Sequence, residues 1–184
     1  SQSKVIYPRC FKGDIRKIYA QGEVFLEVAH DKKHPFIVES DDFKLQVLGT
    51  KFNISNYKGG TTNIVLVEGA VEVTDKNEKK ARLNPNDLLN IANGTIAYQK
   101  QVDVAEYISW VEGIMLLNGN DLSQIIQRLS IYYGISIQCD PIIGKEKVYG
   151  KLDLKDDIDE VIECIQQTLP FTIEKSDTSI YLNK

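Results

Sequence analysis

The sequence contains few of the residues from which catalytic and metal sites are commonly built. Among its 184 residues there are two histidines, three cysteines and one tryptophan. Cys10, Cys139 and Cys164 are far apart and form no C-x-x-C pair, so the ligand spacing of a zinc site is absent. The odd number of cysteines argues against a fully paired disulfide framework, although a bridge between Cys139 and Cys164 stays open.

Long hydrophobic runs are also missing. No apolar stretch approaches the ~20 residues that a membrane-spanning helix needs, and no signal-peptide pattern opens the chain. Taken alone, these absences indicate a cytoplasmic protein, but they are also expected of a soluble piece of a longer one. The net charge is −4 and the basic residues are spread among acids, which disfavours nucleic-acid binding. An apolar content of 42% is sufficient for a packed core.

No set of side chains in the sequence predicts catalysis. His30 and His34 lie in one charged turn before Pro35, where a metal-binding helix is not expected. The acidic clusters at 41–42 and 153–160 lack the spacing of a calcium loop, and no H-E-x-x-H or G-x-S-x-G motif occurs. We therefore expect no enzyme, no catalytic residue, no metal ligand and no cofactor.

The first half of the chain predicts strands. Residues 22–57 alternate apolar and polar side chains with a period of two, as in Val24, Leu26 and Val28, which is typical of half-buried strands. Short polar turns separate the runs, so we expect the strands to be antiparallel. Turn signals recur about every 8–12 residues, up to the strong hairpin dipeptide at 93–94, and no long helical period occurs among them. The predicted fold is a mainly β, antiparallel sandwich-like domain.

The pattern becomes helical after residue 116. Two apolar stripes recur with the same offsets, 36 positions apart: Leu122, Ile125, Ile126, Leu129 and Tyr133, then Ile158, Val161, Ile162, Ile165 and Leu169. Gly134 follows the first stripe and Pro170 the second, and both residues are unfavourable within a helix. After each of them the sequence predicts a strand. We predict two β-α-β units in tandem that share one small sheet, with a last strand at 179–182. The domains are then 1–108, all β, and 109–184, β-α-β/β-α-β, with the boundary near 109–113.

Four segments, residues 22–29, 35–38, 47–54 and 66–73, follow one another in the order and spacing of the FecR family, which the chain resembles. The resemblance extends to the sequence Trp-Val-Glu-Gly at 110–113, which is similar to the Trp-x-x-Gly that opens the family's C-terminal domain. That domain resembles the short β-α-β domains of secretins and TonB-dependent transporters. The positions that we expect to define the fold are Gly22, Glu23, Gly49, Thr50, Phe52, Gly69, Trp110 and Gly113.

The sequence departs from the family pattern at two places. Asn86 stands where the family's Leu-x-Pro-Gly corner has glycine, and asparagine is the residue that best replaces glycine in a left-handed conformation. The strand with a Leu-x-Asp-Gly motif that normally begins the first domain is missing, as are the cytoplasmic anti-sigma segment and the membrane helix. We therefore expect the periplasmic, soluble part of a single-pass inner-membrane protein of a Gram-negative bacterium.

The resemblance implies a role in transmembrane signalling and transcription regulation. In the family, a ligand-loaded TonB-dependent outer-membrane transporter presents a signalling domain to the regulator, which then controls an extracytoplasmic-function (ECF) sigma factor. The implied partners are that transporter domain and, through the absent cytoplasmic segment, the sigma factor. As the docking edge for strand addition we hypothesise the last strand or the strand at 135–138. The candidate partner-binding residues are Ile135, Ile137, Ile180 and Leu182.

A different class of function is an envelope- or carbohydrate-binding module with a sandwich core. Such a module would present an aromatic platform on an exposed face, because sugar rings stack on aromatic side chains. Tyr57 and Tyr98 are the candidates for this platform.

Overall fold

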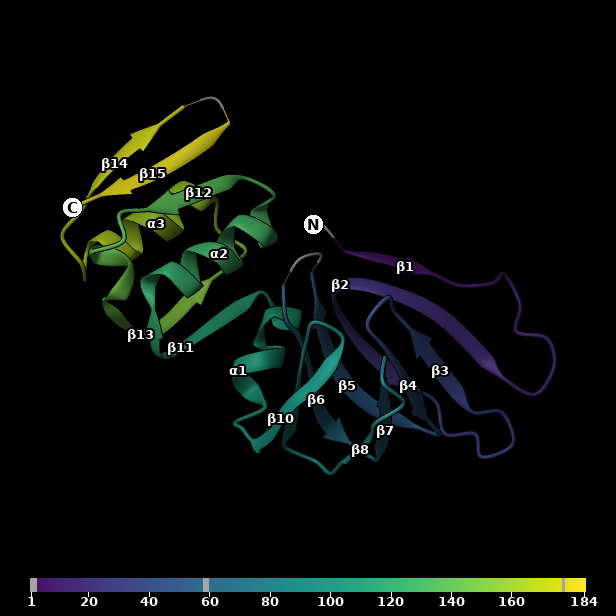
Figure 1. Ribbon diagram of the computed structural model, residues 1–184. Coiled ribbons are helices and arrows are strands. Elements are labelled where there is room, and N and C mark those ends of the chain that lie inside the picture. Colours follow the sequence, from purple (N-terminus) through teal and green to yellow (C-terminus); the bar gives the residue numbers. More distant parts are fainter. Residues whose placement is uncertain (1–2, 58–59, 177) are drawn as a thin grey trace. The chain divides into compact units, whose positions relative to one another are not determined.

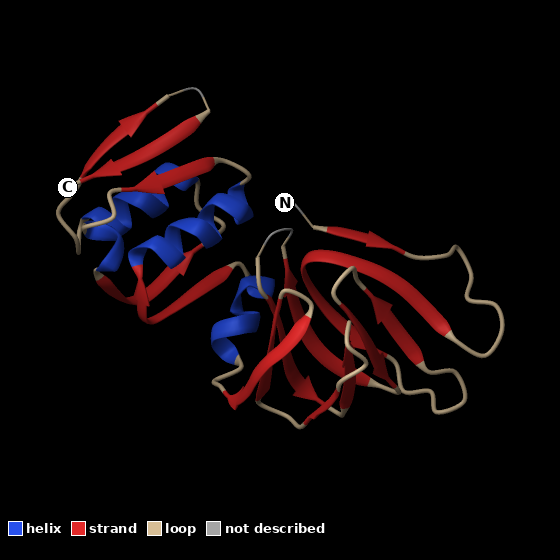
Figure 2. Ribbon diagram, viewed as in Figure 1, coloured by secondary structure: helices blue, strands red, loops and turns tan. Residues whose placement is uncertain are grey.

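The computed structural model describes residues 3–57, 60–176 and 178–184 (Figure 1). They form two compact units, Ser3–Tyr107 and Ile108–Lys184, which we call the N-terminal and the C-terminal unit. Strands dominate the N-terminal unit, and the longer helices belong to the C-terminal unit (Figure 2). The mainly β plus α+β class predicted from the sequence is thereby confirmed.

The N-terminal unit is built from strands of three to thirteen residues. In chain order these are β1 (Lys4–Ile6), β2 (Arg16–Val28), β3 (Phe36–Glu39), β4 (Phe43–Val47), β5 (Thr50–Asn56), β6 (Thr62–Glu68), β7 (Val71–Asp75), β8 (Lys80–Leu83), β9 (Asp87–Ala92) and β10 (Thr95–Gln101). Their order across the sheet is β10-β9-β6-β5-β2-β3-β4-β7-β8, and β1 also pairs with β2.

One strand pair departs from the predicted antiparallel arrangement. The first half of β2 pairs in parallel with β3, so that Arg16 lies opposite Phe36, while its second half pairs antiparallel with β5. The period-two alternation begins at residue 22, whereas β2 already begins at Arg16 and is one continuous strand. The prediction of a wholly antiparallel unit is therefore wrong for this pair.

Strand β2 is strongly curved, which lets it belong to both halves of the sheet (Figure 1). The Arg16 side chain, at its beginning, donates from Nη1 to the Ala29 carbonyl oxygen just beyond its end, over 3.1 Å. Arg16 Nε donates to the His34 carbonyl oxygen over 2.9 Å. These bonds hold the loop after β2 against the start of the same strand.

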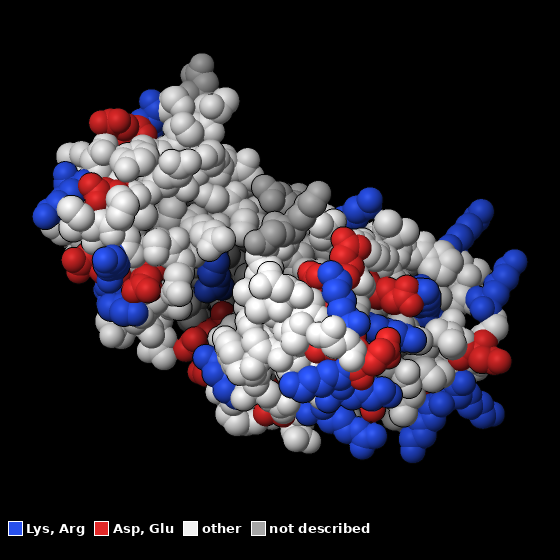
Figure 3. Space-filling model, viewed as in Figure 1, with Lys and Arg blue, Asp and Glu red and all other residues white. Residues whose placement is uncertain are grey.

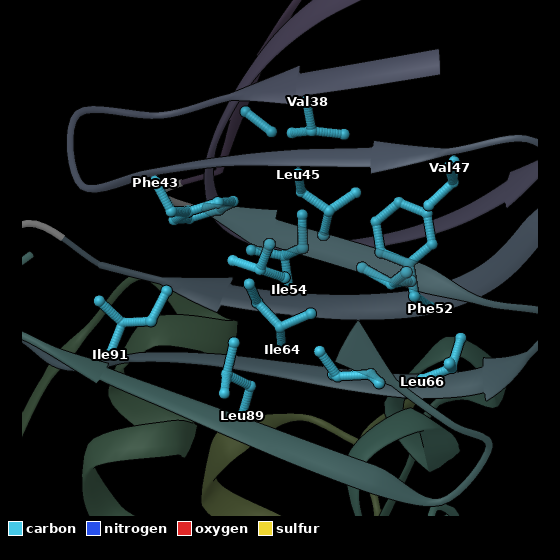
Figure 4. Packing of buried hydrophobic residues seen from close by; sticks show 14 of the residues in the cluster. Val38, Phe43, Leu45, Val47, Phe52, Ile54, Ile64, Leu66, Leu89 and Ile91 are labelled. Carbon is cyan, nitrogen blue, oxygen red and sulfur yellow. The ribbon is translucent and has the colours of Figure 1, made fainter. Parts of the chain in front are cut away.

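The core of the N-terminal unit lies between the two halves of this curved sheet (Figure 4). In β4, Phe43, Leu45 and Val47 are buried and the intervening Lys44 and Gln46 are exposed, which confirms the period of two. The buried set, each at most 9% exposed, is Ile18, Ala20, Phe36, Val38, Phe43, Leu45, Val47, Phe52, Ile54, Ile64, Leu66, Val71, Val73, Leu83, Leu89, Ile91 and Ile96. Burial of such apolar surface is the main favourable term in folding.

A buried carboxylate joins β7 to β10. Asp75 is 4% exposed, and its Oδ2 accepts a hydrogen bond from the Ile96 amide over 2.9 Å. Its Oδ1 accepts from the amides of Asn77 and Lys79 in the adjoining turn. The Ile96 amide is the main cause that lowers the pKa of Asp75, because it stabilises the charged form.

A short helical segment marks the boundary: α1 (Ala105–Ile108) ends where the C-terminal unit begins, and the 3-10 helix η1 (Ser109–Glu112) is the first element within it. Its elements are β11 (Ile114–Asp121), α2 (Leu122–Tyr133), β12 (Ser136–Cys139), the 3-10 helix η2 (Ile143–Lys145), β13 (Lys147–Asp153), α3 (Ile158–Gln166), β14 (Thr172–Lys175) and β15 (Ser179–Asn183). Within the described ranges, no helix has both the length and the apolar character required to span a membrane.

The two β-α-β units are present, but they do not share one sheet as predicted. Their first strands, β11 and β13, pair with each other in a two-stranded sheet, and a second sheet has the order β12-β15-β14. Helices α2 and α3 lie between the two sheets (Figures 1 and 2). Both sheets cover the apolar stripes of the helices, so neither β-α-β unit has a core of its own.

The helix ends agree in part with the sequence. The Asp157 carboxylate caps α3 by accepting from the amides of Asp159 and Glu160 over 2.9 and 3.0 Å. Asp121 precedes α2 without such a bond and pairs with Lys147 instead, over 2.9 Å. Helix α3 stops at Gln166, before the end of the predicted stripe.

Candidate partner-binding surface

The last strand of the chain is not an edge. Strand β15 lies in the middle of its sheet, parallel to β12 on one side and antiparallel to β14 on the other. Ile180 and Leu182 are 5% and 0% exposed and belong to the core. The expectation that β15 offers its backbone to a partner is wrong, because both of its neighbours already use that backbone.

Strand β12 is an edge, but the outward backbone groups of Ile137, near its middle, have a partner within the unit. The Ser130 hydroxyl on α2 accepts from the Ile137 amide over 2.9 Å and donates to the Ile137 carbonyl oxygen over 3.1 Å. Ile137 is 6% exposed, and Ile135 is half-buried against the same core. The structure therefore brings the candidate partner-binding residues together inside the unit.

Strand β14 is the other edge of this sheet. The Ser176 amide donates to the Ser179 carbonyl oxygen over 2.9 Å, which makes these two residues a hydrogen-bonded pair of the β14–β15 hairpin. Bonded and non-bonded pairs alternate in antiparallel strands. Counting back by this rule, the amide and carbonyl groups of Ile173 and Lys175 point away from β15. They point to the outside of the sheet.

Hydrogen bonds within the unit mark where the open edge of β14 begins and ends. Before it, the Gln166 side-chain amide donates to the Phe171 carbonyl oxygen over 2.7 Å. After it, Ser176 begins the hairpin connection. The sequence did predict a strand after Pro170. It carried no signal for which neighbour that strand takes, so this edge was missed.

The two-stranded sheet has irregular edges. The β11–β13 register shifts between Asn118 and Asn120, and Gly119 between them has a φ of 76°. In β13, Gly150, which lies opposite Leu117, has a φ of 134°. Bulges of this kind bend a strand and hinder pairing along its edge.

The two units differ in charge. Residues 108–184 contain twelve Asp and Glu against seven Lys and Arg, while residues 1–107 contain fourteen against fifteen. Figure 3 shows Lys and Arg side chains gathered over the N-terminal unit around β7 and β8. The negative charge of the protein is therefore concentrated in the C-terminal unit.

The N-terminal unit has an open groove of 380 Å³ over β3, β4 and β7. Its charged side chains pair with one another, as Lys76 with Asp42 and Lys80 with Glu72, each over 2.8 Å. The hydrogen bond from Lys80 is the main cause that lowers the pKa of Glu72. Two of the three lysines that line the groove are thus held in ion pairs within the protein.

The two histidines in the turn before β3 do not form part of a metal-binding cluster among the described residues. His34 Nδ1 contacts Asp31 Oδ2 at 2.7 Å in the turn before β3. Among residues 3–57, 60–176 and 178–184, no three His, Cys, Asp or Glu side chains are grouped to hold a metal. All three cysteines are free, so the bridge between Cys139 and Cys164 that the sequence left open is not formed.

The two aromatic residues considered for sugar binding have different surroundings. Tyr98 is 49% exposed on β10. Tyr57 is half-buried, and its hydroxyl donates to Glu23 Oε2 over 3.4 Å. Lys100 Nζ lies 5.9 Å from the centroid of the Tyr98 ring.

Close packing accounts for several of the positions expected to define the fold. A Cβ on Gly49 would come within 2.5 Å of His30 Cα, and one on Gly22 within 2.6 Å of Ser3 Cα. Thr50 Oγ1 donates to the Ala70 carbonyl oxygen over 3.1 Å. Phe52 is fully buried, and Glu23 accepts from the Asn53 side chain.

At the start of the C-terminal unit, two further expected positions have structural roles. The Trp110 ring is packed against the C-terminal core. Gly113, with a φ of 79°, ends η1 in a left-handed conformation. At the corner before β9, Asn86 has a φ of 71°, the conformation expected where the family has glycine.

Comparison with known proteins gives matches along both units. The family model described as "FecR protein" matches residues 1–72, and the model "FecR, C-terminal" matches residues 114–182. Two crystal structures of a "putative anti-sigma factor" from Parabacteroides distasonis, at 1.65 and 2.50 Å resolution, are similar over 99% of this chain and 86% of theirs. The identity is 30% in both, and the TM-scores are 0.82 and 0.81. No curated protein matches the chain.

Proposed function

The chain belongs to the FecR family as a region of a FecR-like anti-sigma factor, and from this premise we propose that it senses a TonB-dependent outer-membrane transporter in its ligand-loaded state. It receives the transporter's periplasmic signalling domain. Through the rest of the full-length protein, that binding event controls an ECF sigma factor.

The observation that carries this proposal is the end-to-end similarity to an anti-sigma factor fold. The similarity covers 99% of the chain at 30% identity, so it includes both units and their order. A regulator of this class acts by binding. The proposed signal is therefore a change in protein–protein contacts, without a chemical reaction.

We further propose that the chain is the periplasmic part of a single-pass inner-membrane protein. In this arrangement the transporter and the sigma factor lie on opposite sides of the inner membrane. The anchored protein is then the physical connection between them. Contact with the transporter domain has to reach the cytoplasm through the membrane helix.

A calorimetric titration of residues 1–184 with the isolated signalling domain of the transporter encoded nearest its gene tests the proposal. We expect saturable binding, and no binding of a signalling domain from an unrelated transporter, which serves as the control. The absence of binding to every candidate transporter domain contradicts the proposal. Saturable binding to envelope glycans in its place would establish the carbohydrate-binding class.

A further inference from the structure

We propose that β14 is the docking strand of the C-terminal unit, and that an extended, basic segment of the partner protein adds to its outer edge. This inference rests on the proposed function, because it names the surface and the binding mode of that same interaction. Strand addition takes its affinity from main-chain hydrogen bonds and its specificity from the side chains that alternate along the edge.

The first step is the set of unpaired backbone groups. By the alternation of the β14–β15 ladder, Ile173 and Lys175 each direct one amide and one carbonyl group outward. Among the described residues, no side chain accepts from these two amides or donates to these two carbonyl oxygens. Water-exposed edges of this kind are templates for another strand.

The second step is that the competing edges of the C-terminal unit are capped in part or irregular. Ser130 occupies both outward groups of Ile137 on β12. The β11–β13 ladder carries a bulge at Asn118 and Asn120. In the N-terminal unit, the Gln99 side chain donates to the Arg82 carbonyl oxygen on β8 over 3.2 Å. Strand β14 is therefore a regular edge of the acidic unit, and no side chain of the described residues occupies the outward groups of Ile173 and Lys175.

The third step is charge, which selects the occupant. With twelve acids against seven bases, residues 108–184 attract a basic segment. Two copies of this unit would bring like charges together, so pairing of β14 with a second copy is disfavoured. On β14 itself, Glu174 is exposed and takes part in no ion pair among the described residues, while Lys175 is paired with Asp159 over 2.7 Å. A Lys or Arg side chain of the added strand, opposite Glu174, would give Glu174 an ion-pair partner.

The backbone can be tested without disturbing the sheet. Proline at position 175 removes an outward amide, and β15 does not use that amide, so Lys175→Pro is expected to fold. Lys175→Ala loses the same ion pair with Asp159 but keeps the amide, and it is the matched control. We expect Lys175→Pro to weaken binding of the transporter signalling domain about tenfold or more, and Lys175→Ala to change it less than about threefold.

The charge of the edge is tested by a second matched pair. Gln138 and Glu174 are exposed in the same cross-strand row, opposite Tyr181 from its two sides. We expect Glu174→Lys to weaken binding about tenfold, and Gln138→Lys, on the capped edge, to leave it within about twofold. Thermal melting of each variant confirms that it is folded before the titration.

The outcomes separate this inference from the function on which it rests. Saturable binding by the unchanged chain with equal affinity for folded Lys175→Pro overturns the docking strand and leaves the proposed function standing. If Gln138→Lys weakens binding and Glu174→Lys does not, the docking strand is also overturned, because the interface is then on β12. Failure of the unchanged chain to bind any candidate signalling domain contradicts the proposed function and this site with it.

Discussion

The Ser130 hydroxyl and the Ile137 backbone form a two-way contact, in which the oxygen accepts from the amide at 2.9 Å and donates to the carbonyl at 3.1 Å. Position 130 is on α2 and position 137 on β12, seven residues later, with the left-handed Gly134 between them. A side chain of the preceding helix thereby closes the edge of the following strand. This contact leaves Ile137 no outward backbone group for a partner strand.

Ser130→Ala is predicted to destabilise the C-terminal unit by about 1–2 kcal/mol, because both partly buried groups of Ile137 lose their partner. The unfolding can be followed by fluorescence, since Trp110 is the single tryptophan and packs on that unit's core. Ser123→Ala, at an exposed position of the same helix, is the control and is expected to change stability by less than about 0.5 kcal/mol. Equal effects of the two variants would contradict the capping role.

Tyr133 predicts a loss of stability at alkaline pH. Its hydroxyl donates to the carbonyl oxygens of Leu154 and Asp156 over 3.1 and 2.9 Å, and burial raises its pKa to about 12. The unfolded chain loses this proton near pH 10.0, so stability is complete below that pH and falls as the pH rises towards 12. In Tyr133→Phe the C-terminal unit should be less stable at pH 7 and should lose less between pH 10 and 12. A fall of equal size in both proteins would contradict this assignment.

Asp31 is predicted to titrate far below its ordinary range. The hydrogen bond with His34 is the main cause that lowers the pKa of Asp31 from 3.8 to about 2. Its contribution to stability is therefore present above pH 3.8 and is lost as the pH falls towards 2. Carboxyl NMR titration should place the pKa of Asp31 near 2 in the unchanged chain and higher in His34→Ala. His30→Ala is the control, and an equal rise in both variants would exclude the His34 contact as the cause.

Gly69 is predicted to tolerate no side chain. Its φ is 95°, and a Cβ there would lie 2.7 Å from the Gly49 carbonyl oxygen and 2.9 Å from Thr50 Oγ1. Gly13 has a similar φ of 84° but open space around a Cβ. Gly13→Ala should therefore cost only the backbone strain of about 1–2 kcal/mol. Gly69→Ala should cost clearly more in thermal unfolding of the N-terminal unit, and equal costs would contradict the steric account.

Local pattern was sufficient to predict much of this fold. The alternation of Phe43, Leu45 and Val47 and the helical stripe beginning at Leu122 report which side chains face a core, and both are found there. Asn86 adopts the left-handed conformation that its place in the sequence suggested. The face that a side chain occupies and the backbone conformation at a turn are set by residues a few positions away, so a local sequence pattern predicts them.

Pairing between distant strands could not be predicted in the same way. Leu182 was expected on a free edge, yet it lies opposite Cys139, on a strand more than forty positions earlier in the chain. A strand flanked on both sides and an edge strand show the same alternation, because periodicity reports faces and not neighbours. For the same reason Ile180→Pro is a poor test of docking, since it would break the ladder with β12.

Hydrogen exchange of residues 1–184, alone and with the proposed transporter signalling domain, is the most direct test of the central claim. The outward amides of Ile173 and Lys175 have no partner in the free chain's ladder, so they should exchange rapidly there. On saturation with the transporter domain, we predict that both amides become protected while the Ile137 amide, already bonded to Ser130, changes little. Saturated binding with protection confined to β11, β13 or the N-terminal unit, and none at β14, would contradict the account.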